Sequence, residues 1–217
     1  MMISEEMCKE IEKRLKNIPI IWNGKDAVLE MKNAGSRNWR QMEWIGFYFQ
    51  YLCEKYLQEL FRFQFPRYGN ASFDGLYNTP FDFKAHAANT KNHKIPVNDR
   101  EAIERGIGDF GSIGLIVAVG NVTYDDENKT FQKWHDALKG EPSKYVLENK
   151  KRGAWSRKRK SRLTLEKISI IEITQKTLER CGSFQTGFRN SDGSPRREKV
   201  LVDFDKLGND ELIYSIK

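Results

Sequence analysis

The apolar positions in the first part of the chain recur every three or four residues, which is the spacing of one helix face. The pattern predicts a helix from Ser4 to about Asn17, capped by Ser4, and a second helix from Asp26 to Lys32. The longest helix is expected from Asn38 to about Phe61, with a broad stripe packed on the core. That stripe consists of Met42, Ile45, Phe49, Leu52, Cys53, Tyr56, Leu57 and Leu60.

Further along, the pattern changes to strands that are apolar on both faces. Ser112–Gly120 is such a run, and the β-branched segment Leu165–Ile173 predicts another core strand. Helices are expected at 98–105, 130–138 and 174–181, between or after these strands. Alternating helices and buried strands indicate an α/β fold, with a central mixed β-sheet flanked by helices. At 217 residues, the chain 1–217 is expected to form a single domain.

A hairpin is predicted from Ala71–Phe73 and Phe81–Ala87, joined by a segment of turn-forming residues. Side chains two apart on a strand share a face, so Asp82, Lys84 and His86 would line one side of the second strand. The phenylalanines and alanines between them would pack on the other side. The sequence therefore predicts a half-buried strand with a charged face.

This face, with one acid just upstream, has the residue types of a metal-dependent phosphodiesterase. Asp74 and Asp82 would hold a hard divalent cation through oxygen, and Lys84 would hold or polarise the attacking water. The alternative is a surface hairpin whose aspartate and lysine are simply solvated. His86 would contact a phosphate or the water, or else make a structural hydrogen bond.

The arrangement resembles the PD-(D/E)xK nuclease signature, with Asp74 as the first acid, Asp82 as the second and Lys84 as the lysine. Phe73 stands where the signature often has proline. The resemblance implies a restriction-endonuclease-like core and a Mg²⁺ cofactor bound by Asp74 and Asp82, with the carbonyl of Phe83 as a further ligand.

Many nucleases of this superfamily carry a glutamate on the helix before the catalytic strands, and Glu43 stands at the matching place. The resemblance therefore assigns Glu43 to the catalytic, metal-binding set. Gly46 leaves room beside this carboxylate. The alternative is an exposed glutamate in the first helical turn, favoured by the helix dipole.

Positive charge is concentrated in segment 150–162. The chain has a net charge of +7, and this segment carries eight positive residues in thirteen without an acid, so the remainder is near −1. Such a segment favours a polyanionic partner, although many charge runs are only solvated surface. Trp155 lies inside it and would stack on a base or pack on the body. The positive residues are Lys150, Lys151, Arg152, Arg157, Lys158, Arg159, Lys160 and Arg162.

A second predicted DNA contact is the C-terminal hairpin, 184–204. Arginine, asparagine and glutamine bond base edges in the major groove, and they cluster around its turn. A group of restriction endonucleases has a similar Gly-x-x-Asn-Ser-x-Gly-x-Pro-Arg element, and 187–196, which includes Arg189, matches it. The alternative is plain turn chemistry. The residues expected to contact DNA are Gln185, Arg189, Asn190, Arg196 and Arg197.

The composition of the chain indicates the cellular compartment in which the protein is expected. Three widely spaced cysteines form neither a disulfide framework nor a zinc site, and they fit a reducing cytoplasm. No apolar run is long enough to span a membrane, and no signal peptide is expected at the N-terminus.

Together, these features are those of a type II site-specific deoxyribonuclease that cleaves double-stranded DNA at a short sequence with Mg²⁺. The family implies a homodimer, because two-fold protein symmetry matches a palindromic target. Two alternatives stay open: a structure-selective or repair nuclease on the same core, and a nucleic-acid-binding protein without catalysis.

Overall fold

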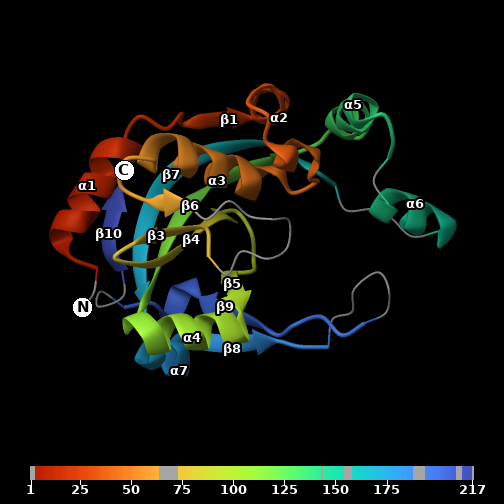
Figure 1. Ribbon diagram of the computed structural model, residues 1–217. Coiled ribbons are helices and arrows are strands. Elements are labelled where there is room, and N and C mark those ends of the chain that lie inside the picture. Colours follow the sequence, from red (N-terminus) through yellow and green to blue (C-terminus); the bar gives the residue numbers. More distant parts are fainter. Residues whose placement is uncertain are drawn as a thin grey trace.

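A mixed β-sheet forms the centre of the protein (Figure 1). The computed structural model describes residues 3–63, 73–142, 144–153, 158–187, 194–208 and 212–216. Within these residues seven strands join in the order β1-β7-β6-β4-β3-β2, and β10 also pairs with β7. Strands β4 and β6 are parallel and the other pairs are antiparallel. The strands are β1 (Ile21–Asn23), β2 (Arg62–Phe63), β3 (Gly75–Tyr77), β4 (Thr79–Ala87), β6 (Ile113–Tyr124), β7 (Lys160–Ile173) and β10 (Leu212–Ile216).

Helices cover the two faces of this sheet, and a smaller sheet packs with the helices of one face. Helices α1, α2 and α3 lie on one side, and α4, α7 and a sheet of order β5-β9-β8 lie on the other (Figure 1). The predicted α/β class with a mixed sheet flanked by helices is therefore confirmed. The elements are α1 (Glu5–Leu15), α2 (Gly24–Asn33), α3 (Trp44–Leu57), α4 (Arg100–Phe110), α5 (Thr130–Lys139), α6 (Lys144–Lys151), α7 (Gln175–Cys181), β5 (Lys94–Asp99), β8 (Gly182–Gln185) and β9 (Lys199–Asp203).

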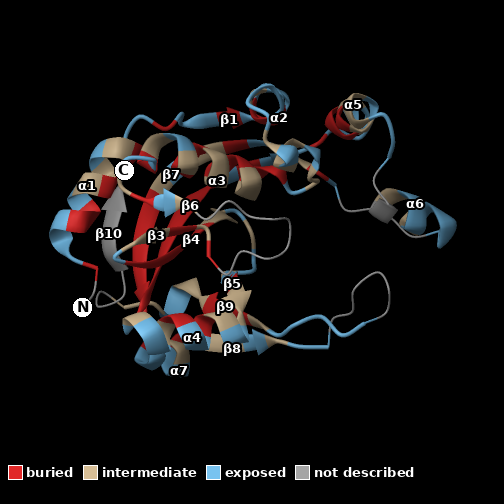
Figure 2. Ribbon diagram, viewed as in Figure 1, coloured by how far each residue is buried: buried red, intermediate tan, exposed pale blue. Residues whose placement is uncertain are grey.

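Each face of the sheet has its own hydrophobic core, because alternate residues of the strands point to opposite sides. Ile116 and Ala118 of β6 belong to the core beneath α1–α3, whereas Leu115 and Val117 belong to the core shared with α4 and the small sheet. Figure 2 shows the central strands as buried and the outer helix faces as exposed. The doubly buried strand predicted at Ser112–Gly120 is thus confirmed, and it extends to Tyr124.

Local capping explains where several predicted helices begin. The Ser4 side chain accepts a hydrogen bond from the Met7 amide at 3.1 Å and starts α1 at Glu5. Thr174 and Thr177 form a reciprocal capping box at the start of α7. These helices match the sequence prediction closely.

The long helix expected from Asn38 to Phe61 is wrong at its start. Residues Arg37–Arg40 form a short 3₁₀ helix, Gln41 is extended (ψ 140°), and α3 begins only at Trp44. The Trp39 carbonyl, which a continuous helix would use, accepts a hydrogen bond from His135 of α5 at 2.8 Å. The Trp44 indole donates to the Lys160 carbonyl at 2.7 Å, so contacts between distant segments set this boundary.

The predicted hairpin exists, but its first strand is displaced. Strand β3 begins at Gly75 rather than ending at Phe73, and the turn is at Asn78, which has a positive φ of 58°. Gly75 lies in the strand, where a Cβ would come within 2.9 Å of the Phe61 ring. Residues 71 and 72 lie outside the described part of the chain.

The C-terminal hairpin is also present, since β8 and β9 pair antiparallel from Gly182↔Val202 to Gln185↔Lys199. Its tip, 188–193, lies outside the described residues. The predicted helix at 98–105 begins at Arg100 and extends to Phe110. In the described part of the chain, no helix is long and apolar enough to cross a membrane.

Candidate active site

Strand β4 holds the predicted catalytic pair at the centre of the molecule. It pairs with β6 along 81–87 on one edge, whereas its described pairing with β3 on the other edge ends at Phe81. Asp82 is 2% exposed, and its Oδ2 lies 3.4 Å from Lys84 Nζ, one strand repeat further along the same face. Asp82 and Lys84 thus lie on the same face of the strand, as predicted, and form a direct ion pair.

Asp74 lies beside this pair, just before β3. Its amide donates to the Phe81 carbonyl at 3.0 Å, and its Oδ2 accepts from the Phe83 amide at 2.7 Å. The Asp74 charge also raises the pKa of Asp82, so the two carboxylates lie within electrostatic reach of each other. The structure therefore brings Asp74, Asp82 and Lys84 together, with the Phe83 backbone at the Asp74 carboxylate.

Burial dominates the electrostatics of Asp82. It raises the pKa of the Asp82 carboxyl to about 7, an effect that Lys84 opposes and the Asp74 charge reinforces. Burial alone would lower the pKa of Lys84, but the charges of Asp82 and Asp74 outweigh it, so the pKa of Lys84 is raised. Lys84 thus stays protonated, and Asp82 is poised to ionise near neutral pH.

The contacts of Asp82 with its partners are long. Oδ1 lies 3.4 Å from the Asn98 amide nitrogen, and the buried Oδ2 faces Lys84 Nζ at 3.4 Å without a hydrogen bond of regular geometry. A cation would relieve this charge, and the Asp74 carboxylate beside it supplies more oxygen. These donors fit Mg²⁺, which uses one or two carboxylates and keeps several waters.

Glu43, the predicted third metal ligand, is exposed, whereas Asp82 is buried. It is the N-cap residue of α3, its side chain is 63% exposed, and it pairs with Lys160 at 3.3 Å. Among the described residues, no group of three histidines, cysteines or acids is placed to hold a metal ion. Helix α3 carries another acid, Glu54, that is influenced by Asp74. Burial raises the pKa of Glu54, and the negative charge of Asp74 raises it further.

Lys84 and Asp74 line a cleft of about 580 Å³ between α3 and the small sheet. A second cavity of about 500 Å³ adjoins it and shares Glu43, His86 and Lys160 with it. Among the described residues that line the two cavities, lysines outnumber acids, with Glu43 and Asp74 as the acids. The lysines are Lys84, Lys94, Lys158, Lys160 and Lys199.

His86 lies on the wall of both cavities. Its ring stacks on Phe204 with centroids 6.2 Å apart, and its buried Nε2 has no hydrogen-bond partner among the described residues. Burial and then the neighbouring His93 lower the pKa of His86. The predicted contact between His86 and a phosphate remains a prediction.

The basic segment divides into parts with different surroundings. Lys150 and Lys151 end α6 and Arg152 follows, all exposed, whereas Trp155 and Arg157 lie outside the described residues. Lys158 pairs with Glu127, and Lys160 points to Glu43 at the cleft. Of the described residues in this segment, Lys158 and Lys160 therefore line the two cavities.

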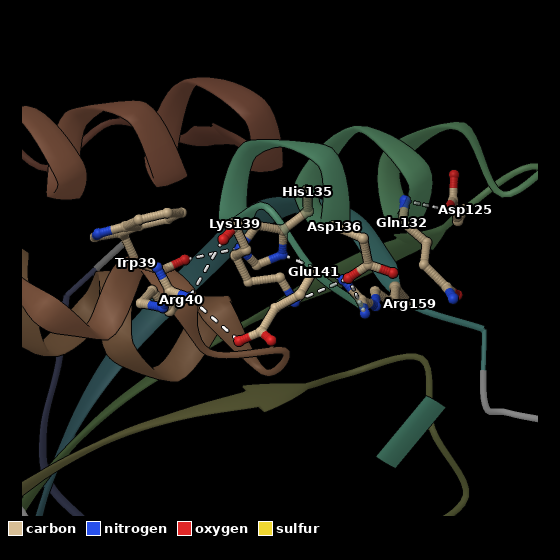
Figure 3. Close-up of polar contacts among 9 residues, drawn as sticks. All are labelled: Trp39, Arg40, Asp125, Gln132, His135, Asp136, Lys139, Glu141 and Arg159. Carbon is tan, nitrogen blue, oxygen red and sulfur yellow. Dashed lines mark hydrogen bonds and ion pairs between the residues drawn. The ribbon is translucent and has the colours of Figure 1, made fainter. Parts of the chain in front are cut away.

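Arg159 is buried, which argues against the DNA contact predicted for it. Its side chain is 1% exposed and pairs with Asp136 at 2.9 Å, while Nη1 lies 3.2 Å from His135 Nδ1 (Figure 3). His135 Nε2 donates to the Trp39 carbonyl, and Lys139 also pairs with Asp136 at 2.8 Å. Arg159 thus attaches α5 to the body.

The predicted base-reading residues are only partly described. Gln185 ends β8, and Arg196 and Arg197 are exposed beside β9, with Arg197 Nη1 3.7 Å from Asp99 Oδ2. Arg189 and Asn190 lie outside the described residues.

Two site residues were not predicted from the sequence. Asn98 contacts Asp82, and Lys199 lines the cleft from the small sheet. Neither has a sequence signal of its own, because both reach the site through the packing of one sheet on another.

Comparison with protein-family models, curated proteins and solved structures finds no match to this chain.

Proposed function

We propose that this chain is a type II restriction endonuclease-like deoxyribonuclease, which hydrolyses phosphodiester bonds of double-stranded DNA with Mg²⁺. The observation that supports it best is the buried Asp82–Lys84 pair beside Asp74, where Lys84 and Asp74 line a cleft that also contains Lys160 and Lys199. A restriction-endonuclease-like core is part of this proposal.

Each residue has a separate role in the proposed reaction. Asp74 and Asp82 would hold Mg²⁺, with the Phe83 carbonyl as a further oxygen donor. When bound, Mg²⁺ supplies Lewis-acid stabilisation of the charge that develops on the phosphate and the leaving 3′ oxygen. Lys84 donates hydrogen bonds that orient the attacking water, and its positive charge favours the hydroxide form of that water.

The cleft would bind the DNA backbone. Lys94, Lys158 and Lys160 would neutralise phosphates next to the scissile one, which is a strongly salt-dependent contribution. The exposed Lys150, Lys151 and Arg152 would extend this contact. The β8–β9 hairpin would read base edges through Gln185, Arg196 and Arg197, and a palindromic target would require a homodimer.

Cleavage of phage DNA tests the proposal directly. The purified chain is incubated with DNA and either Mg²⁺ or EDTA, beside Asp82→Asn and the matched control Asp109→Asn, an exposed acid of α4. We expect discrete fragments that require Mg²⁺, persist with Asp109→Asn and fall at least about 100-fold with Asp82→Asn, because a metal ligand is lost.

The other outcomes separate the alternatives. A smear of fragments would favour a structure-selective or nonspecific nuclease on the same core. Intact DNA whose migration is retarded in a gel would indicate a nucleic-acid-binding protein without catalysis. DNA that is neither cut nor bound would contradict the proposal altogether.

A further inference from the structure

Lys199 is the first residue of β9, and it enters the cleft from the side opposite α3. Its side chain is 32% exposed and lines the same cavity as Lys84 and Asp74. Strand β9 is also the second strand of the C-terminal hairpin, in which Lys199 pairs with Gln185. One strand thus carries both the hairpin and a cation in the cleft.

The charges around Lys199 are not balanced. Asp99, its register partner on β5, lies 3.9 Å from Lys199 Nζ through Oδ1, but its Oδ2 faces Arg197 at 3.7 Å. Two cations therefore share one carboxylate. Burial, together with the positive charges of Lys84 and Arg196, lowers the pKa of Lys199, while Asp99 and Asp82 oppose the shift.

We propose that Lys199 binds a phosphate of the DNA substrate next to the one at Lys84, with Asp99 as its counter-ion in the free protein. The identity of the ligand rests on the proposed nuclease function. An anion between the two lysines would offset their repulsion, and at these long ion-pair distances Asp99 releases Lys199 at little cost.

A nucleic acid backbone suits this position better than a free phosphate ion. Lysines also line the adjoining cavity, Lys94 and Lys158 among them, so the two cavities together offer more cations than one phosphate ion would use. Because Arg197 lies only two residues before Lys199, the first residue of β9, contacts of the hairpin and of the cleft with DNA would form together.

Salt dependence of DNA binding measures this contact. Binding of a random-sequence duplex is followed in EDTA, so that nothing is cut, at several chloride concentrations. Each phosphate contact contributes about 0.9 to the slope of log K against log salt. We expect Lys199→Met to lower that slope by about one contact and to weaken binding several-fold, and Lys199→Arg to retain both.

Two further variants act as controls. Lys206→Met removes an exposed lysine of the segment that follows β9, outside the cleft lining, and should leave affinity and slope unchanged. Asp99→Asn frees Lys199 and Arg197 and should tighten binding, while asparagine still suits the N-cap of α4. It also tests the proposal independently should Lys199→Met fail to fold.

The outcomes distinguish this inference from the function on which it rests. If the wild type binds DNA and Lys199→Met binds with the same slope, or Asp99→Asn weakens binding, Lys199 is not a phosphate contact. If phosphate displaces DNA far better than chloride at equal ionic strength, the site takes a free phosphate ion. A wild type that binds no DNA would contradict the proposed function itself.

Discussion

At the scale of single residues, the site combines features that oppose stability. Asp82 is almost completely buried, and its Oδ2 accepts no hydrogen bond from the described residues. The pKa near 7 already includes the attraction of Lys84, so the ionised carboxylate is still disfavoured by its surroundings. Such a residue is expected where binding a cation matters more than stability.

Because the Asp82 carboxylate is buried, replacing it with a neutral amide should stabilise the protein, and the gain should depend on pH. The pKa of Asp82 is raised in the folded protein. Its contribution to the free energy of unfolding is therefore fully present below about pH 4 and is lost as the pH rises through about 7. Without metal, Asp82→Asn should therefore be more stable than wild type by on the order of 1–3 kcal/mol at about pH 8, and by much less at about pH 5. Urea unfolding at both pH values measures this difference.

Asp109→Asn is the matched control for that comparison and should show no pH-dependent difference. If Asp82→Asn lost more stability at the higher pH, the carboxylate would be satisfied by the fold, and the case for a cation beside it would fail.

At the scale of elements, local patterns predicted what local forces determine. The spacing of Met7, Ile11 and Leu15 and the cap at Ser4 place α1 within two residues. The doubly apolar run before Gly120 could only be a buried strand. By contrast, the break before α3 depends on a hydrogen bond between Trp39 and His135, which are 96 positions apart. No window of sequence contains that information.

The same reasoning explains the mixed result for the candidate site. Asp74, Asp82 and Lys84 were predictable because one hairpin carries all three. The burial of Arg159 was not predictable, because its partner, Asp136, is distant in sequence. In the sequence alone, Arg159 cannot be told from the exposed basic residues beside it. Lys199 reaches the cleft only because the small sheet packs on the large one.

Arg159 and Lys158 are neighbours in sequence, and the structure predicts opposite effects for them. Arg159→Met breaks a buried ion pair and leaves Asp136 with Lys139 alone, so unfolding should become easier by roughly 3–5 kcal/mol. Lys158→Met removes an exposed pair and should cost at most about 1 kcal/mol. Under the proposed function, only Lys158→Met lowers the salt slope of DNA binding, by about 0.9.

Urea unfolding and salt-dependent binding of both variants check this pair of predictions. A stable Arg159→Met with a reduced slope would mean that Arg159 contacts DNA after all. An unchanged slope in Lys158→Met would remove Lys158 from the proposed backbone contact.

At the scale of the whole molecule, only some of the elements that cover the central sheet line the cleft. The small sheet and the start of α3 form its walls, whereas α1 and α7 lie away from its lining (Figure 1). Exposed positive residues lie outside the cleft lining as well, among them Lys150, Lys151, Arg152, Arg196 and Arg197. Nonspecific attraction to DNA would therefore involve many surfaces, but productive binding should involve one.

Lysine acetylation with and without DNA tests where DNA lies. We expect DNA to protect Lys84, Lys160 and Lys199 by severalfold, because their ammonium groups would lie against phosphates inside the cleft. Lys9 of α1 and Lys176 of α7 should react equally in both conditions, because neither lines the cleft. Mass spectrometry of the peptides, in EDTA and at moderate salt, gives each ratio. Equal protection at Lys9 and Lys199 would indicate binding through net charge alone, and the cleft would then need another ligand.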